Sequence, residues 1–330
     1  MQYSFLICSE RSGSNFVTKI LDGHSQVCGP SPVHLLRYFV PLEAKYGDLN
    51  NADNWSQFTA DVHTFFELKI SHWDTTVTHD ELKSVQERSL AGLFRFLYEK
   101  EANVHGKNSL FVKENHAYKL IPYYLQHFPG AKFIWAVRDP RDMALSWKKD
   151  AILRGGVVRS ANIWKEDQKH SAYLYSYMEK TGMMLKVHYE NLTAETETES
   201  KRMTEFLGIP YEQAMTGMEK SASSQANATA SAGWSNLNKG VLKNNSRKYL
   251  KELSKEEIQF IEYLCQVEME ATGYQPEFPL ISRTEFIELQ HKLSAEEKWE
   301  KEAYLQVSET EKLKRKNWVT WLNSLQKKLQ

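Results

Sequence analysis

The sequence predicts an α/β fold, with a central, mostly parallel sheet flanked by helices and a helical C-terminal extension. Short apolar runs alternate with segments of helical periodicity, which is typical of such sheets. The composition is that of an ordinary globular protein, with 41% hydrophobic and 25% charged residues, which excludes a disordered chain. At 330 residues, the chain still fits one large domain with insertions.

Four short apolar runs are expected to form buried strands, at residues 3–8, 109–112, 132–137 and 184–187. Helical spacing is found in the segments between them, at residues 15–21, 81–101, 118–127, 142–152 and 161–180. In parallel sheets of this kind, ligands bind at the carboxyl ends of the strands.

The later part of the chain has a different composition. Residues 220–248 are small and polar and predict a long loop that could serve as a lid. A helix is expected after Ser254, with Glu257 completing a capping box. We therefore expect an α/β domain over residues 1–280 and a charged helical extension over residues 281–330, with Trp299, Trp318 and Trp321 on that extension.

Charge and cysteine content exclude several classes of protein. Lys plus Arg and Asp plus Glu both number 42, so bulk electrostatics would not hold nucleic acid or an anionic membrane. Three cysteines without a CxxC motif argue against a disulfide framework and a structural zinc site. The first residues lack the basic region of a signal peptide, and no apolar stretch reaches 18 residues, so we expect a cytoplasmic protein.

The first candidate site lies between the first strand and the first helix. Arg11, Ser12, Gly13, Ser14 and Asn15 combine a flexible backbone, hydroxyl and amide groups and a guanidinium at a helix start. This pattern suits a bound phosphate, because helix N-termini carry free N–H groups and a partial positive charge. The loop lacks the Gly-Lys-Ser/Thr ending of nucleoside-triphosphate P-loops, which disfavours an ordinary kinase.

The second candidate site follows the strand at 132–137. Arg138 ends the strand, Pro140 suits the first turn of a helix, and Ser146 lies further along that helix. A nucleoside triphosphatase would place an acidic residue at this strand end to hold Mg²⁺, whereas Arg suits a phosphate. Asp139 follows directly and keeps the metal interpretation open.

Together the two motifs resemble those of sulfotransferases that use 3′-phosphoadenosine-5′-phosphosulfate (PAPS), and the layout is closest to the carbohydrate and tyrosylprotein branch, in a bacterial-like form. The resemblance covers roughly residues 3–275 and implies the P-loop-like sulfotransferase fold. It implies that residues 11–15 bind the 5′-phosphosulfate, and that Arg138 and Ser146 bind the 3′-phosphate. The chain departs from the family pattern at Asn15, where Thr is usual, and at Glu10, where Pro is frequent.

Further segments fit the same resemblance. Lys113 lies where the family has its lysine strand, and Tyr189 ends a strand whose Tyr approaches the adenine in the family. Lys239 and Arg247 lie in a segment similar to the family's late Lys-Pro-Val loop, with Gly240 in place of Pro. The resemblance thus adds Tyr189, Lys239 and Arg247 to the residues expected to contact the cofactor.

Sulfuryl transfer needs a base for the proton of the acceptor. His34 is the titratable group in the rigid segment after the first helix, where the resembling branches place a catalytic Glu, and we expect it to act as the base. His116 is the second candidate, followed by Glu114, and Glu10 is expected to cap or to pair with Arg11.

The function expected from the resemblance is in-line transfer of the sulfuryl group from PAPS to a hydroxyl or amine of a small-molecule or carbohydrate acceptor, leaving PAP. Lys113 and Arg11 would stabilise the leaving phosphate, so no metal is implied. Two alternatives stay open: a Mg²⁺-dependent nucleotide or small-molecule kinase with a degenerate loop, and an inactive PAP-binding protein. The extension could cover the site or support a homodimer.

The acceptor pocket is expected from residues 37–105 and 220–248. Aromatic and acidic residues in the first segment suit a sugar or a small polar compound, and we find no basic cluster typical of a heparin-like acceptor. The other histidines show no metal spacing. The pocket residues expected in the first segment are Tyr38, Trp55, Phe58, Phe65, Phe66, His72, Trp73 and Asp74.

Overall fold

One parallel sheet forms the centre of the protein. The computed structural model describes residues 1–220, 222–234, 240 and 245–329. The strands pair in the order β2-β3-β1-β4-β5, and every pairing is parallel, which confirms the predicted sheet. The strands are β1 (Gln2–Cys8), β2 (Val27–Cys28), β3 (Ser109–Lys113), β4 (Lys132–Val137) and β5 (Met184–His188).

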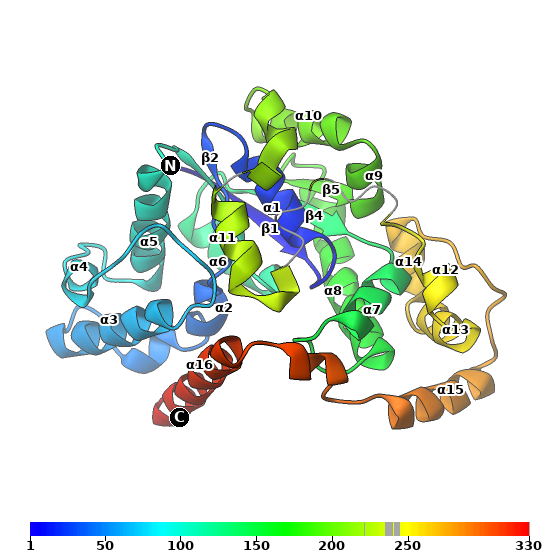
Figure 1. Cartoon of the computed structure of the whole chain (residues 1–330). Helices are drawn as coiled ribbons and strands as arrows, with labels where there is room; N and C mark the ends of the chain where they lie inside the picture. The colour runs from blue at the N-terminus through cyan, green and yellow to red at the C-terminus, as the bar shows by residue number, and fades with distance from the viewer. Residues whose placement is uncertain (221, 235–239, 241–244, 330) are drawn as a thin grey trace.

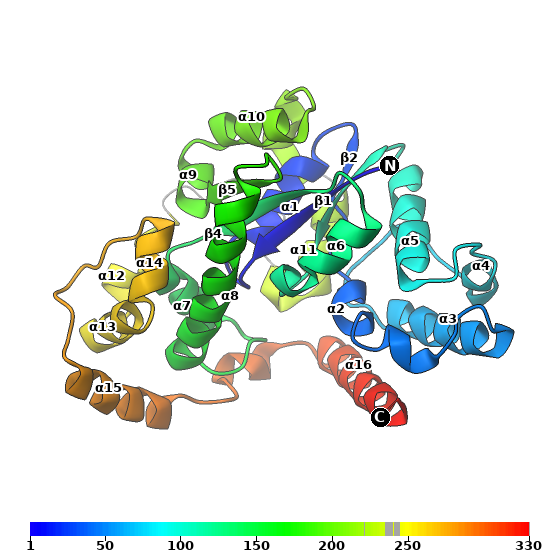
Figure 2. The ribbon, with the colours of Figure 1, turned by 180° about the vertical axis from the view of Figure 1, so that it is seen from behind.

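Both faces of the sheet are buried, as expected for parallel strands connected by helices. In β1, Phe5 and Ile7 join one hydrophobic cluster, whereas the alternating Leu6 and Cys8 join another. Helices cover the two faces, as both views show (Figure 1, Figure 2). On the Leu6 face lie α1 (Ser14–Asp22), α9 (Tyr189–Ala194) and α10 (Thr196–Leu207), and on the Phe5 face lie α5 (Leu90–Val104), α6 (Ile121–His127) and α8 (Val157–Met178).

The remaining helices extend the Phe5 layer on either side. One group precedes α5 in the chain: α2 (Leu35–Phe39), α3 (Ala52–Glu67) and α4 (His79–Lys83). A second group packs about α8 and α7 (Pro140–Lys149): α12 (Tyr249–Glu252), α13 (Lys255–Leu264), α14 (Gln266–Thr272) and α15 (Arg283–Glu296). Two further helices are α11 (Ala222–Ala230) and α16 (Glu309–Lys328).

The structure corrects two of the predicted elements. The single helix expected at 81–101 is two helices, α4 and α5, because Ser89 caps a new helix by accepting a hydrogen bond from the backbone N–H of Gly92. The loop expected at 220–248 contains α11, since its alanine-rich segment has high helix propensity. The capping box of Ser254 and Glu257 is confirmed at the start of α13.

The C-terminal extension is helical, as predicted, and it returns to the main body. After α15, the chain crosses the molecule so that α16 packs against α3 (Figure 1). In both views α16 lies on the side of the molecule toward which β1 points (Figure 1, Figure 2). Within the described residues, no helix is both long and apolar enough to cross a membrane.

Candidate active site

The loop between β1 and α1 leads directly into the N-terminus of α1. Gly13 has φ of +80°, and a Cβ there would lie 2.2 Å from the ring of Tyr189, so only glycine fits. No side chain caps α1, which starts at Ser14, so its first N–H groups remain available. The loop therefore presents backbone donors at the positive end of a helix.

Two buried polar atoms at this loop are unsatisfied among the described residues, namely Ser12 Oγ and Arg138 Nε. Arg138 ends β4 and donates from Nη1 to the backbone oxygen of Arg11 at 3.0 Å. Its guanidinium also lies 4.4 Å from the centre of the Tyr189 ring. Because buried donors without a partner are rare, these atoms mark a place for an anionic ligand.

The two predicted anion motifs touch through Arg11. Its Nε donates to Ser146 Oγ at 3.0 Å, and its Nη1 lies 2.9 Å from Asp150 Oδ2. The expected pairing of Glu10 with Arg11 is wrong, since Glu10 Oε1 accepts from the side-chain amide of Asn115. Asp150 thus takes the guanidinium, and Glu10 is left facing the cavity.

Residues next to the start of α7, at the second motif, determine where this helix begins. Asp139 caps α7 by accepting from the N–H of Arg141, and Pro140 occupies the first turn. The same carboxylate binds the buried guanidinium of Arg141 at 2.7 Å, and Arg141 also pairs with Glu262 at 2.5 Å. Asp139 is therefore occupied in holding α7 against α13, which disfavours the metal interpretation of this residue.

Lys113 ends β3 beside the loop. Its Nζ donates to Asn15 Oδ1 at 2.8 Å, and burial lowers the pKa of its ammonium. An anion bound by the loop would compensate this burial and favour the charged form of Lys113.

His34 lies directly before α2 in a left-handed backbone conformation, with φ of 65°. Its Nδ1 accepts from the backbone N–H of Asn115 at 3.2 Å and lies 3.6 Å from Glu114 Oε2. Burial, followed by the charges of Lys113 and Arg37, lowers the pKa of His34 to about 3, so the ring is neutral. With Nδ1 accepting from Asn115, the ring proton is on Nε2.

Glu114 lies beside Nδ1 of this ring. The side chain is fully buried, and burial raises its pKa to about 8, against the opposing effect of the N–H groups of Leu36 and Arg37. When Glu114 ionises, its Oε2 becomes an acceptor for a proton on His34 Nδ1, which would free Nε2 to accept one. Glu114 itself does not line the large cavity.

His116, the second candidate base, lies elsewhere. It lines a separate polar cavity of about 100 Å³, and its Nδ1 is 3.4 Å from Asp167 Oδ1. Glu10 and Asn115 line both this cavity and the large one. The structure thus brings His34 and Glu10 to the large cavity and leaves His116 outside it.

The large cavity has a volume of about 1330 Å³. One wall contains the predicted anion motifs, with Arg11, Gly13, Ser14, Asn15, Lys113, Arg138, Ser146 and Tyr189. His34, Arg37 and Tyr38 form a second wall, joined by residues 69–71. The cavity is also lined by residues 231, 232 and 234, by residues 149–154 and by one face of α16.

Several residues expected at the site lie elsewhere. Of the aromatic residues expected in the acceptor pocket, only Tyr38 lines the cavity, because Trp55, Phe58, Phe65, Phe66 and Trp73 are buried in the hydrophobic core. Arg247 is exposed and pairs with Glu277 at 2.9 Å, away from the cavity. Lys239 lies outside the described residues.

Sequence reasoning left open that the extension could cover the site, but it did not identify which residues of α16 line the cavity. Lys312, Arg315 and Lys316 line the cavity from positions that share one helix face. The basic run from Lys312 to Lys316 was visible in the sequence, but nothing in its spacing places it near a site that starts three hundred residues earlier.

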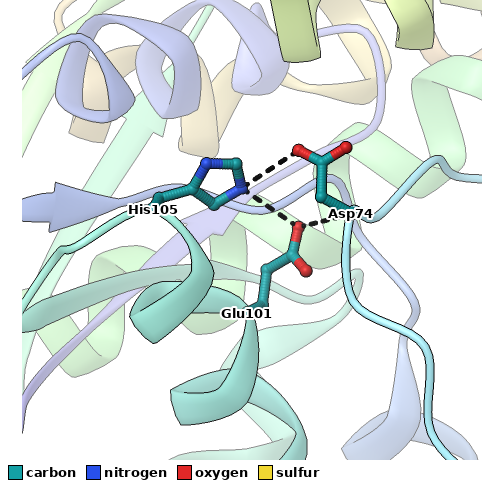
Figure 3. A group of neighbouring side chains, drawn as sticks. All are labelled: Asp74, Glu101 and His105. Carbon is teal, nitrogen blue, oxygen red and sulfur yellow. Dashed lines mark hydrogen bonds and ion pairs between the residues drawn. The ribbon is translucent and has the colours of Figure 1, made fainter.

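Outside the cavity, the structure assembles a cluster that the sequence spacing did not indicate (Figure 3). His105 Nε2 lies 3.2 Å from Asp74 Oδ2 and 3.5 Å from Glu101 Oε1, so one cation could contact all three groups. Glu101 also accepts from the backbone N–H of Asp74 and of Thr75. These bonds give the cluster a structural role, which is to fix the segment after Ser71 to α5.

Comparisons with known proteins address the family and the fold of this chain. Residues 4–213 match the Sulfotransferase family. A Caenorhabditis briggsae protein named for protein-tyrosine sulfotransferase activity is 25% identical over 211 residues, or 62% of this chain. The chain spans about 65% of the length of that relative.

Among solved structures, the sulfotransferase domain from the curacin biosynthetic pathway aligns with a TM-score of 0.51 and 17% identity, covering 89% of this chain and 98% of that domain. The sulfotransferase domain of the Synechococcus PCC 7002 olefin synthase gives a TM-score of 0.46 and 16% identity, covering 89% and 94%. The similarity to the domain from the curacin pathway shows the fold alone. Because the family match covers residues 4–213, which is more than half of the sequence, this chain belongs to the sulfotransferase family.

Proposed function

We propose that this protein transfers the sulfuryl group of PAPS to a hydroxyl or amine of a small-molecule or carbohydrate acceptor. One observation carries the proposal: two candidate anion-binding elements meet at a single cavity, which Gly13, Ser14, Arg138 and Ser146 line, and Arg138 Nε is buried there without a described partner. A nucleotide with phosphates at both its 3′ and 5′ positions would satisfy both elements at once.

The residues present fit this donor. Residues 12–15 would hold the 5′-phosphosulfate with backbone and side-chain donors, while Arg138 and Ser146 would hold the 3′-phosphate. Arg11 contacts Ser146 and borders the loop, so its charge serves both ends. The ring of Tyr189 lies under the guanidinium of Arg138 and would contact the adenine of the donor. Its hydroxyl accepts a hydrogen bond from the side-chain amide of Asn245 at 2.7 Å.

PAPS supplies an activated sulfuryl group on a phosphate leaving group. Lys113 and Arg11 would neutralise the charge that develops on this phosphate, because both line the cavity beside the loop.

His34 would take the proton of the acceptor. In this proposal, ionised Glu114 holds a proton on His34 Nδ1, where that bond replaces the hydrogen bond now accepted from the N–H of Asn115, and Nε2 then accepts the proton from the attacking hydroxyl. Glu114 acts as a positioning residue, because it is buried behind His34 and has no surface in the large cavity. Glu10 is the alternative base, since it borders the same cavity.

The proposal is tested by isothermal titration of the purified protein with PAP, ATP and ADP, each in EDTA and in Mg²⁺. We expect micromolar PAP binding that does not depend on metal and exceeds ADP binding, because the 3′-phosphate contacts Arg138. Incubation with PAPS and an acceptor library then tests turnover. Mg²⁺-dependent ATP binding without a preference for PAP would favour the kinase alternative instead, and PAP binding without turnover would favour the inactive PAP-binding protein.

A further inference from the structure

The large cavity contains more positive charge than a nucleotide donor needs. Among its lining residues, Lys and Arg outnumber Asp and Glu by more than two to one, although the whole chain is formally neutral. The donor elements account for Arg11, Lys113 and Arg138. Two further groups of cations come from different elements and lie on the walls where an acceptor would bind.

One group of these cations belongs to α16. Lys312 and Arg315 are partly neutralised, because Lys312 pairs with Glu309 and Arg315 with Glu311, each at 2.7 Å. Lys316 follows on the same face, and within the described part of the chain no carboxylate lies within ion-pair distance of it. The face therefore keeps a net positive charge toward the cavity.

A second group lies on the wall that carries the proposed base. Arg37 and Lys69 line the cavity, and neither has an ion-pair partner among the residues that the structure describes. Lys69 is half-buried over the ring of Phe66, 3.9 Å from its centre, and burial lowers the pKa of its ammonium. An anionic ligand would offset the cost of burying these charges.

The two groups border the same space. Trp318 of α16 packs against Tyr38 of α2, with ring centroids 5.1 Å apart. Both rings also line the cavity, together with Leu313 and Val319 of α16. Apolar surface thus lies between the cations, beside His34.

We infer that the acceptor carries an anionic group, a carboxylate or a phosphate, joined to an apolar part that packs against Tyr38 and Trp318. This inference rests on the proposed function and specifies its substrate class. Lys316 and Arg37 recognise the anionic group, which places the hydroxyl of the acceptor on the His34 side of the cavity. The C-terminal helix is then a part of the acceptor site.

The test compares three phenols of similar size: 4-hydroxyphenylpropanoate, its neutral amide, and 3-(4-hydroxyphenyl)propyl phosphate. Each is titrated into the PAP-saturated protein, and binding is followed by tryptophan fluorescence. We expect both anions to bind about tenfold or more tightly than the amide, the range for a charge-assisted contact. The difference between the carboxylate and the phosphate identifies which anion the site prefers.

Substitutions identify the residues that cause the preference for an anionic acceptor. Lys316→Gln and Arg37→Gln are each expected to reduce the preference for the anion about fivefold or more, because one charged contact is lost. Lys314→Gln is the matched control, since Lys314 lies on the same helix but is exposed and does not line the cavity. It should leave the preference unchanged.

The outcomes separate this inference from the proposed function. PAP affinity is measured in every variant, and we expect Lys316→Gln to leave it within about twofold of wild type, well below the effect of one lost charge-assisted contact. If PAP binds but the two anions bind no more tightly than the amide, the inference of an anionic acceptor is wrong. It is also wrong if PAP binds and none of the three phenols does. If Lys316→Gln weakens PAP itself, the charge serves the donor, and the inference also fails. A protein that does not bind PAP contradicts the proposed function instead.

Discussion

The two halves of the cavity are built in different ways. The half that faces the proposed donor comes from two short strand–loop–helix segments, and most of its residues lie within residues 11–15 and 138–146. The half that faces the acceptor is collected from α2, residues 69–71, residues 231–234 and α16, which are far apart in the chain. Local backbone geometry determines the first half, whereas the second depends on how distant segments pack.

This difference predicts how substitutions in each half of the cavity affect ligand binding. Donor residues are held by adjacent backbone and by buried contacts, such as those of Arg138 with Arg11 and Tyr189. Acceptor residues of α16 are held by packing of Trp318 and by the bonds of Glu311 to Ser231 and Arg315. Changes in the donor half should therefore affect PAP binding, and changes in α16 should affect the acceptor alone.

The largest effect is expected at the proposed base, where the halves meet. His34→Asn should lower kcat by about 10²–10⁴-fold, the usual contribution of a general base. PAP affinity should be nearly unchanged, as measured by titration. Glu10→Gln is the comparison variant, and a larger loss of kcat in Glu10→Gln than in His34→Asn would assign the base to Glu10.

Arg138→Ala tests the donor half directly. It should weaken PAP binding by about 2–4 kcal/mol, because a buried, charge-assisted phosphate contact is lost. Titration calorimetry measures the change. Arg202→Ala, which removes an arginine of α10 outside the cavity, is the control. Wild-type affinity in Arg138→Ala would remove this residue from the donor site.

Glu114→Gln tests the link between Glu114 and His34 through pH. In wild type, kcat should rise with pH around the pKa of Glu114, about 8, because the ionised carboxylate holds the His34 proton on Nδ1. The amide cannot ionise, so the variant should lose this rise and keep a low, flat profile. A profile that keeps its rise near pH 8 in the variant would contradict the role of Glu114.

The same substitution changes stability in a defined direction. The pKa of Glu114 is higher in the folded protein than in the unfolded chain, so its contribution is complete below about pH 4.5 and is lost as the pH rises toward 8. The free energy of unfolding should therefore fall with pH more steeply in wild type than in Glu114→Gln. Urea denaturation at pH 5 and pH 8 measures this difference.

Gly13→Ala probes the geometry of the anion loop. The new methyl group would collide with the Tyr189 ring in a left-handed backbone conformation, and we expect a loss of about 1–3 kcal/mol in stability together with weaker PAP binding. Gly106→Ala is the control, since Gly106 has φ of +65° but nothing within 4 Å of the added Cβ. Equal losses in both variants would show that backbone conformation alone is responsible.

The smallest effect on the donor is expected from α16. Trp318→Ala removes the contacts with Tyr38 and Phe65 and should reduce acceptor turnover while leaving PAP affinity within about twofold, less than the cost of one net hydrogen bond. Titration and steady-state kinetics measure the two quantities separately. A parallel loss of PAP affinity would show that the two halves are not independent.

The sequence alone determined the sheet and the anion loops, because both are local. Buried strands have continuous apolar runs, and a glycine at a helix start is read directly from the chain. The predicted strands match the observed ones to within one residue at each end, and β2 was too short to show a pattern. The prediction of one continuous helix at 81–101 was wrong, because a single serine, Ser89, caps the start of a second helix.

Only the tertiary structure decided the acceptor side. Helical and strand periodicity shows that Phe58 or Phe65 is apolar, but not whether the ring faces a core or a cavity, and both proved to be in the core. The basic run of α16 resembles any solvated helix until packing of Trp318 places it over the site. Contacts between residues so distant in the chain depend on the fold as a whole, so no local signal showed that Lys316, Arg37 and Lys69 line one cavity.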